Sequence, residues 1–552
     1  MSDNANTLAL LGDEAAALGA IHAGLSAAYG YPGTPSTEIM EYLIEKSRES
    51  DGAAGSFVAK WCSNEKTALE AALGTSFAGK RAIVTMKHVG LNVAADPYMN
   101  SALLGINGGL VIAVADDPGM HSSQGEQDSR YFSAFAIAPC LEPRNQQEAY
   151  VMCREAFEVS ERFHVPVMLR LSTRLSHARA AVTPLSAGKQ NEVSKAKDWT
   201  QWTLLPAFAR RNYAELLEKQ KRLTEWSTAY GVNKLEIGDQ SFAVITSGLG
   251  GNYYEENLQD LIAARGGKAP SRLHIGAYPL PVDSIRKLCE KAEKVLLLEE
   301  GQPFIEERIK GILPQNITVK GKLDGSLDRT GELDPDNVRK SLGLPPRSSV
   351  LNSGIKIPEL PGRPPQLCQG CPHGDSYNAI NKALAELGAP CRESPNSVMT
   401  SDIGCYALAA APPYSSIETC VCMGASVAMA RGAGEAGIKY AVATIGDSTF
   451  LHSGITALVD AVQADSPMTL IILDNSIVAM TGCQETIVPS EKLANLVLGL
   501  GVNPEHLLEL EAKGQFLEEN VAKLKKEFEH RGLSVVIFHR ECLEAFRKRK
   551  KK

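Results

Sequence analysis

The sequence has 552 residues, of which 44% are apolar and 22% are charged, and its net charge is −7. These values are ordinary for a folded globular protein, and the length predicts three or four domains because one hydrophobic core cannot serve so long a chain. The acidic balance argues against nucleic acid as a partner. The first residues lack a basic region before their short apolar run, and no apolar stretch nears the roughly 20 residues that span a bilayer. We therefore expect a soluble cytoplasmic protein with no membrane partner.

Short apolar runs alternate with helical patterns from residue 8 to about residue 185. The expected strands are 27–33, 81–88, 108–118 and 165–173. This alternation predicts an α/β domain over 1–185, a doubly wound parallel sheet with helices on both faces. Residues 186–235 are rich in Lys, Arg, Glu and Trp without strand-like runs, and they are expected to form a helical connector.

Two further α/β units are expected after the connector. The first covers 236–345, with strands at 242–248 and 294–301. Residues 346–365 are rich in Pro, Gly and Ser and predict an extended linker. The last unit covers 366–552, and its expected strands are 440–447, 468–475 and one at about 534–539. The basic run RKRKKK at 547–552 is more typical of a solvated chain terminus than of a binding arm.

Polar side chains follow two apolar strands in the last unit. One strand runs into Gly446-Asp447-Ser448 and the other into Asp474-Asn475. Both polar ends would lie at the carboxyl edge of neighbouring parallel strands, where open α/β sheets bind ligands. Mg²⁺ takes oxygen ligands and usually shares them with phosphates, so Asp447, Asn475 and a nearby carbonyl could form half of its shell. The alternative is a pair of strand-end turns, because Gly-Asp and Asp-Asn are common turn formers.

Together these two motifs are similar to the thiamine diphosphate signature, with Ser448 in place of its second glycine. Further segments resemble the large subunit of indolepyruvate:ferredoxin oxidoreductase, in the 2-oxoacid:ferredoxin oxidoreductase superfamily. They are YPGTPSTEI (31–39), SNEKTALEAALG (63–74), TMKHVGLNVAADP (85–97), CPHG (371–374), DIGCYAL (402–408), CVCMGAS (420–426) and DNSIVAMTG (474–482). The likeness spans nearly the whole chain in the family's order.

The resemblance implies a domain for each part of thiamine diphosphate. Residues 1–185 would be the pyrimidine-binding domain, 236–345 a transketolase C-terminal-like domain, and 366–552 the diphosphate-binding domain. Glu65 is implied to hydrogen-bond the aminopyrimidine ring and to promote formation of the reactive C2 ylid. The alternative for Glu65 is a carboxylate favoured by the helix macrodipole, with Ser63 capping that helix.

Four other residues are candidates for binding the substrate. Thr34 resembles the family's contact to the substrate carboxylate, although Thr-Pro-Ser is also a turn sequence. Lys87 and His88 follow an apolar strand, where a cation could meet a carboxylate and an imidazole could handle protons. Arg130 could bind a carboxylate through two hydrogen bonds. Each of the last three could instead be a surface or capping charge.

The resemblance also implies contacts for the diphosphate. Gly424 would lie against it, and Gly446 would let the backbone approach it closely. Asp447, Asn475 and the carbonyl of Ile477 are the implied Mg²⁺ ligands.

Twelve cysteines without even spacing or a secretory signal favour free thiols or metal ligands over disulfides. Cys368 and Cys371 form a CxxC pair, but no second CxxC or His pair supports zinc, since Cys420 and Cys422 have one intervening residue. A thioredoxin-type disulfide would follow a strand, whereas this pair follows the predicted linker. The open alternatives are an iron–sulfur cluster and ordinary buried thiols.

A [4Fe–4S] cluster needs four thiolates. The superfamily resemblance implies one cluster, and the matching residues are Cys368, Cys371, Cys405 and Cys542, with Cys483 as the rival fourth ligand. The family's large subunit usually continues into a ferredoxin-like domain, and the sequence shows no such cysteine runs before Lys552. We therefore expect electrons to leave for ferredoxin or another subunit.

The resemblance implies the catalytic subunit of a thiamine diphosphate-dependent 2-oxoacid oxidoreductase, assembled with a smaller partner subunit. It would oxidatively decarboxylate an arylpyruvate to an acyl-CoA, using coenzyme A and passing single electrons to the cluster. Two alternatives remain open. One is a non-oxidative 2-oxoacid decarboxylase without a cluster, and the other is a non-catalytic binding subunit with the same fold.

Overall fold

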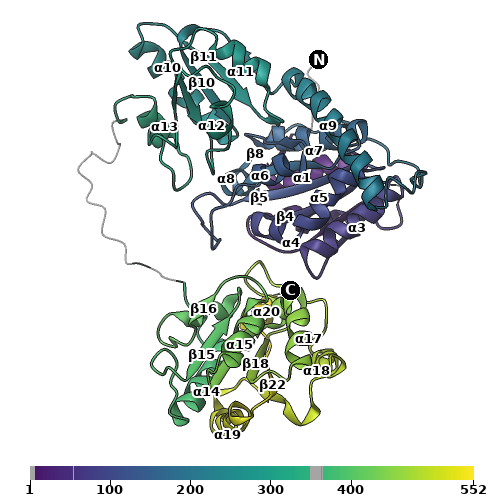
Figure 1. The fold of residues 1–552 in the computed structure, drawn as a ribbon, viewed down its shortest axis with the longest axis vertical. Coiled ribbons are helices and arrows are strands. Elements are labelled where there is room, and N and C mark those ends of the chain that lie inside the picture. The colour runs from purple at the N-terminus through teal and green to yellow at the C-terminus, as the bar shows by residue number, and fades with distance from the viewer. Residues whose placement is uncertain (1–6, 54, 348–361, 363–364, 552) are drawn as a thin grey trace. The chain divides into compact units, whose positions relative to one another are not determined.

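The computed structural model describes residues 7–53, 55–347, 362 and 365–551. The chain divides into two compact units, Met1–Lys356 and Ile357–Lys552, which are described separately (Figure 1). The predicted linker 346–365 lies almost entirely outside the described residues. Within the described part of the chain, every helix is too short or too polar to cross a membrane.

The first unit is built on a seven-stranded sheet with the strand order β12-β6-β7-β5-β4-β2-β3. Its strands are β2 (Ala27–Gly30), β3 (Val58–Trp61), β4 (Ala82–Lys87), β5 (Leu110–Asp116), β6 (Cys140–Leu141), β7 (Val167–Ser172) and β12 (Ala277–Tyr278). All neighbours are parallel except β12 and β6. The four strands expected in this region are confirmed.

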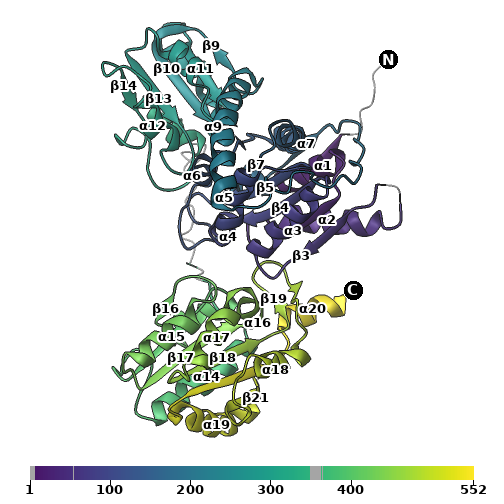
Figure 2. The same cartoon turned by 45° about the vertical axis from the view of Figure 1, so that its right-hand side comes forward.

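Helices cover both faces of this sheet (Figures 1 and 2). They are α1 (Gly12–His22), α2 (Thr37–Glu49), α3 (Glu65–Phe77), α4 (His88–Val93), α5 (Ala95–Leu104), α6 (Arg130–Ala136), α7 (Gln146–Phe163) and α8 (Thr173–His177). Helix α1 packs against α2 and α7, whereas α3 packs against α4 and α5. The doubly wound fold class is therefore confirmed.

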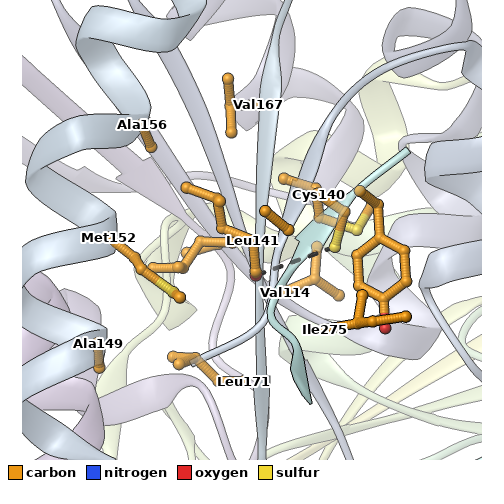
Figure 3. Packing of buried hydrophobic residues seen from close by; sticks show 14 of the residues in the cluster. Val114, Cys140, Leu141, Ala149, Met152, Ala156, Val167, Leu171 and Ile275 are labelled. Atoms are coloured by element: carbon orange, nitrogen blue, oxygen red, sulfur yellow. Dashed lines mark hydrogen bonds between the residues drawn. The ribbon is translucent and has the colours of Figure 1, made fainter. Parts of the chain in front are cut away.

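The central strands are apolar because helices shield them on both sides. Every residue of β4, β5 and β7 is buried. Figure 3 shows how Val114 of β5, Leu171 of β7 and Met152 of α7 pack around the short strand β6. Cys140 in β6 makes only a weak contact, 3.9 Å from its Sγ to the Leu141 carbonyl, so it acts as a small apolar side chain.

The region 179–235 joins the two sheets of the first unit. Strand β8 (Arg179–Val182) pairs antiparallel with β1 (Leu8–Leu11). After an irregular stretch, α9 runs from Pro206 to Ala229, with its proline in the first helical turn, where the missing N–H is harmless.

A five-stranded sheet completes the first unit, in the order β14-β13-β10-β11-β9. Its strands are β9 (Leu235–Glu236), β10 (Asp239–Ser247), β11 (Pro270–Ile275), β13 (Lys294–Leu298) and β14 (Thr318–Lys320). Its helices are α10 (Leu249–Ala264), α11 (Val282–Cys289), α12 (Phe304–Ile309) and α13 (Pro335–Ser341). Both strands expected here are confirmed.

The second unit holds a six-stranded, all-parallel sheet in the order β16-β15-β17-β18-β22-β21. Its strands are β15 (Ser397–Ser401), β16 (Thr419–Cys420), β17 (Tyr440–Gly446), β18 (Met468–Asp474), β21 (Leu507–Glu511) and β22 (Leu533–His539). Strands β19 (Ile477–Val478) and β20 (Gln484–Glu485) form a separate hairpin. The three strands expected here are confirmed.

The helices of the second unit connect these strands. They are α14 (Pro372–Glu386), α15 (Ala425–Glu435), α16 (Asp447–Thr449), α17 (Ile455–Gln463), α18 (Ser490–Gly499), α19 (Leu517–Glu529) and α20 (Leu543–Lys551). A short 3₁₀ helix covers Cys405–Ala410, and a π-helical turn, Phe450–Gly454, joins α16 to α17. The strand order reverses between β15 and β17, and ligands bind at such switch points in open α/β sheets.

Candidate functional site

Glu65 occupies the first position of α3 with a buried side chain, only 5% exposed. The alternative for Glu65 had Ser63 capping this helix, but Asn64 caps it by accepting a hydrogen bond from the Thr67 N–H at 2.9 Å. The Glu65 carboxylate packs against the backbone of α4. A Cβ placed on Gly90 would lie 2.4 Å from Glu65 Oε1. The missing side chain at Gly90 therefore makes room for the carboxylate.

Thr34 and Lys87 lie close together in the first unit. Lys87 is the last residue of β4, and its Nζ donates to the Ser122 carbonyl at 2.8 Å. The Ser122 hydroxyl is 3.2 Å from the Thr34 carbonyl, and a Cβ on Gly33 would lie 3.0 Å from the Lys87 Cβ. Burial lowers the pKa of Lys87 to about 8, against the opposing charge of Asp117. A partly desolvated ammonium of this kind can bind a carboxylate.

His88 follows Lys87 and is almost completely buried. Its Nε2 lies 3.1 Å from the Gly125 carbonyl, which can only accept, so Nε2 carries the proton. The other ring nitrogen, Nδ1, is buried without a hydrogen-bond partner among the described residues. This nitrogen is available to accept a proton or a hydrogen bond from a ligand.

Asp117 organises the loop that contacts Lys87, and its place after a strand is its only signal in the sequence. Its carboxylate accepts hydrogen bonds from the Ser122 N–H at 2.8 Å and the Ser123 hydroxyl at 2.5 Å. The Thr173 hydroxyl donates to the other oxygen at 2.6 Å. Burial alone would raise the pKa of Asp117, but these hydrogen bonds hold it below its usual value. Asp117 is thus a positioning residue for Ser122.

Arg130 begins α6 and is fully buried. Its guanidinium pairs with Asp128 at 2.5 Å and Glu299 at 3.0 Å, and it donates to the Tyr278 hydroxyl at 3.3 Å. Each of its three nitrogens already donates to a protein oxygen. The structure therefore places Arg130 in a buried ion network and not with Thr34 and Lys87. We do not propose it as a substrate ligand.

In the second unit, Asp447 and Asn475 lie at the carboxyl ends of β17 and β18, which pair in parallel. Asp447 Oδ1 accepts the Ser448 N–H at 2.7 Å, while its Oδ2 is buried without a hydrogen-bond donor among the described residues. Asn475 Oδ1 accepts the Ile477 N–H at 3.1 Å, and its Nδ2 lies 3.1 Å from Nε2 of His373. The expected convergence of these two strand ends is present.

Asp474, which was not selected as a ligand from the sequence, lies beside Asp447. It accepts the Ser490 hydroxyl at 2.8 Å and pairs with His539 Nδ1 at 2.8 Å. Burial and the charge of Asp474 raise the pKa of Asp447 well above its usual value. Two adjacent buried carboxylates, one with an oxygen lacking a donor, fit a hard divalent cation.

Among the described residues, no three His, Cys, Asp or Glu side chains converge on one point that could hold a metal ion. The protein would thus supply only part of an octahedral shell. Mg²⁺ sites shared with phosphates have this character, because the ion keeps waters and takes phosphate oxygens.

Gly424 and Asp402 shape the turn at the switch point between β15 and β17. Gly424 has a φ of +89°, and a Cβ there would lie 2.6 Å from the Ser453 Cβ, so only glycine fits. Asp402 accepts the Ser426 N–H at 2.9 Å and its hydroxyl at 2.5 Å. A Cβ on Gly446 would lie 2.5 Å from the Tyr406 ring. Glycine at these two positions lets Ser453 and the Tyr406 ring pack directly against the backbone.

Four other cysteines lie near enough to Cys405 to affect its ionisation, and we call the five the thiol group: Cys368, Cys371, Cys405, Cys483 and Cys542. Burial, together with the negative charges that the other four would carry as thiolates, raises the pKa of Cys405 to about 12. The Cys371 N–H donates to the Cys368 carbonyl at 3.0 Å, which closes the CxxC turn. The Cys542 N–H donates to the Asn475 carbonyl at 3.2 Å, so the thiol group adjoins the end of β18.

The donor set of the thiol group fits an iron–sulfur cluster. A [4Fe–4S] cluster takes four thiolates, and the thiol group offers five cysteines. Both Cys483 and Cys542 belong to the group, so either could complete the set.

Comparison with known proteins identifies both cofactor-binding regions. Residues 18–207 match the family model for the thiamine diphosphate-binding region of pyruvate flavodoxin/ferredoxin oxidoreductases. Residues 402–538 match the C-terminal TPP-binding domain of thiamine pyrophosphate enzymes. The chain is 36% identical to indolepyruvate oxidoreductase subunit IorA of Archaeoglobus fulgidus, over 97% of this chain and 86% of that protein. The chain belongs to the indolepyruvate oxidoreductase IorA family.

Other matches agree with this membership. IorA of Methanothermobacter marburgensis is 39% identical, over 86% of this chain and 76% of that protein. A solved 2-oxoglutarate:ferredoxin oxidoreductase from Magnetococcus marinus shares the fold, with a TM-score of 0.51 and 16% identity over 62% of this chain and 66% of that one. These matches confirm the predicted fold class, thiamine diphosphate as the cofactor, and a 2-oxoacid oxidoreductase. A decarboxylase and a non-catalytic subunit are not favoured.

Proposed function

We propose that this chain oxidatively decarboxylates an arylpyruvate to an acyl-CoA, working with a smaller partner subunit in the cytoplasm. Membership in the IorA family supports the arylpyruvate, because the relatives are named indolepyruvate oxidoreductase subunits. Coenzyme A as acyl acceptor and ferredoxin or another subunit as electron acceptor are implied by the family resemblance. The word subunit in the relatives' names supports a partner chain.

The carboxylate pair at the end of β17 is the observation that carries the proposal. Asp447 Oδ2 is buried without a donor, next to Asp474, at a switch point of a parallel sheet. Mg²⁺ shared with a diphosphate would satisfy such a pair. Asp447, Asn475 and the carbonyl of Ile477 would hold the ion, Ser448 would flank it, and the backbone at Gly424 and Gly446 would contact the diphosphate.

Residues of the first unit would act on the pyrimidine and the substrate. Bound thiamine diphosphate supplies a carbanion at C2 that adds to the keto carbon and accepts the electrons left when CO₂ departs. Glu65 would hold a proton at Oε1 in hydrogen-bond contact with the aminopyrimidine ring. Lys87 would bind the substrate carboxylate through Nζ, with Thr34 beside it, and His88 Nδ1 would accept a proton.

The thiol group would hold one [4Fe–4S] cluster, which accepts electrons singly. Cys368, Cys371 and Cys405 would be three ligands, with Cys542 as the fourth and Cys483 as the rival. The hydrogen bond from the Cys542 N–H to the Asn475 carbonyl ties this ligand to the proposed Mg²⁺ strand. A cluster there would lie beside the strand end that carries the proposed Mg²⁺ ligands.

An anaerobic preparation of the full chain tests this proposal. We expect about four irons per chain, and dye reduction that requires both indole-3-pyruvate and coenzyme A, with lower rates for pyruvate and 2-oxoglutarate. Glu65→Gln should keep the fold and lose turnover by orders of magnitude, and near-normal activity would refute its role. Aldehyde formation without iron would favour a decarboxylase. Iron without turnover, even after the partner subunit is added, would favour a binding subunit.

A further inference from the structure

Helix α20 is strongly basic in an acidic chain. Residues 543–550 hold four cations and one carboxylate, a net charge of +3, whereas the whole chain carries −7. The cations are Arg547, Lys548, Arg549 and Lys550, and all four are exposed. The basic run is helical as far as Lys551. The first residue of α20, Leu543, packs against another part of the second unit.

The helix begins at the thiol group. Leu543, its first residue, follows Cys542, and a Cβ placed on Gly370 of the CxxC turn would lie 3.5 Å from Leu543 Cδ1. One turn further on, Lys548 Nζ donates to the Gly482 carbonyl at 3.1 Å, next to Cys483. Figure 2 shows α20 beside β19, whose hairpin contains Gly482. The cations thus extend outward from the cysteines.

Folding gives little reason for so many cations here. Arg547 pairs with Glu544 at 2.5 Å and Arg549 with Glu541 at 2.9 Å, but exposed pairs of this kind contribute little to stability. Like charges three or four residues apart on a helix repel each other. Phe546, 39% exposed, lies among them, with Lys550 Nζ 4.5 Å from its ring. An exposed aromatic side chain surrounded by cations is typical of a protein-binding surface.

We propose that the exposed cationic face of α20 is the docking surface for a small acidic protein electron carrier. This inference rests on the proposed function, because it presumes a cluster in the thiol group. Each docked carrier would take one electron, so that the carrier is reduced and the cluster oxidised by one electron and no bond changes. The acidic remainder of the chain would repel nucleic acid. The eight helical residues span only about 12 Å, a length that suits a compact partner. Opposite charge would also steer the encounter and make it salt-dependent.

Binding of an oxidised, acidic two-cluster ferredoxin to the anaerobic full chain tests the surface without turnover. The test variant is the triple substitution Arg547→Glu, Arg549→Glu and Lys550→Glu, which leaves Lys548 in place beside Gly482. The matched control is Lys195→Glu, Lys197→Glu and Lys221→Glu, which makes the same change of charge on exposed residues of the first unit. We expect the test variant to bind ferredoxin at least about tenfold more weakly at low ionic strength, and the control to bind within about twofold of wild type.

The outcomes separate this inference from the proposed function. Equal affinities of test variant and wild type, or no binding by wild type, overturn the docking surface whether or not iron is present. Tighter α20-dependent binding to RNA or to phosphatidylglycerol vesicles than to ferredoxin also overturns it. Weakened binding with unchanged absorbance near 400 nm, and unchanged reduction of a small dye, supports it. The same α20-dependent binding in a chain without iron would support the surface and refute the proposed cluster.

Discussion

Replacing Asp447 with Asn should stabilise the cofactor-free protein and abolish its affinity for thiamine diphosphate and Mg²⁺. In the structure Asp447 Oδ2 is buried without a hydrogen-bond donor, and the charge of Asp474 lies beside it. An unsatisfied buried polar group costs about 1–3 kcal/mol, and more when charged. The neutral amide removes this charge and can donate to Asp474, so the local unfolding free energy should rise by about 1–3 kcal/mol near pH 7.

The raised pKa of Asp447 fixes the sign of the pH dependence. Below the pKa of the unfolded chain, about 3.9, the carboxyl is protonated in both states and carries no penalty. As the pH rises toward the higher folded pKa, the unfolded state ionises first and the wild-type protein loses stability. The gain from Asp447→Asn should therefore be small at about pH 4 and largest at neutral and alkaline pH.

Hydrogen exchange of peptides that span β17 and β18 measures this local stability. The matched control is Asp460→Asn, an exposed aspartate of α17 that pairs loosely with Arg431, which should change stability by less than about 0.5 kcal/mol. Titration calorimetry with thiamine diphosphate and Mg²⁺ measures the loss of affinity. Faster exchange in the cofactor-free variant, or wild-type affinity for the cofactor, would refute the reasoning.

Three further predictions concern the first unit. Gly90→Ala should displace the Glu65 carboxylate, because the new methyl would lie 2.4 Å from Oε1, and it should lower kcat by about tenfold or more. Gly74→Ala in α3 adds a methyl in open space and should leave kcat unchanged. Equal kcat values for the two variants would contradict the role of this contact. The KM for the 2-oxoacid should rise about tenfold per pH unit above pH 8, as Lys87 loses its proton. A Lys87→Met variant that kept the same pH dependence of KM would rule out Lys87 as the carboxylate ligand. Arg130→Met should destabilise the first unit by about 3–5 kcal/mol, because it leaves buried carboxylates unpaired. Urea unfolding followed by tryptophan fluorescence measures this loss, since all four tryptophans lie in the first unit. A variant of wild-type stability with a raised KM would instead support a substrate-binding role for Arg130.

The apolar strands and the ligand-binding edge could be predicted from the sequence because local signals carry them. The apolar runs before Asp447 and Asn475 are long and end in polar residues, so their pairing as neighbouring parallel strands follows from general rules. The thiol group could be anticipated only from the family's pattern. Four of its members are separated by long stretches of chain, and spacing alone cannot bring them together.

Residues whose role depends on distant partners escaped sequence analysis. Arg130 has the chemistry of a carboxylate ligand, but its partners include Glu299, which is far along the chain and reaches it only in the folded protein. Asp474 adjoins the predicted ligand Asn475, yet its closeness to Asp447 depends on strand register. Ser63 and Asn64 are both good helix caps, and only backbone geometry decides that Asn64 caps α3.

We propose that this chain couples a thiamine diphosphate site to a four-iron cluster in the thiol group. Electron paramagnetic resonance of the anaerobic chain, frozen after mixing with indole-3-pyruvate, tests it most directly. The account predicts a reduced-cluster signal in wild type, none in Asp447→Asn until dithionite is added, and none under either condition in Cys405→Ser. A wild-type cluster that dithionite reduces but no 2-oxoacid does, or a fully active chain without iron, would contradict it.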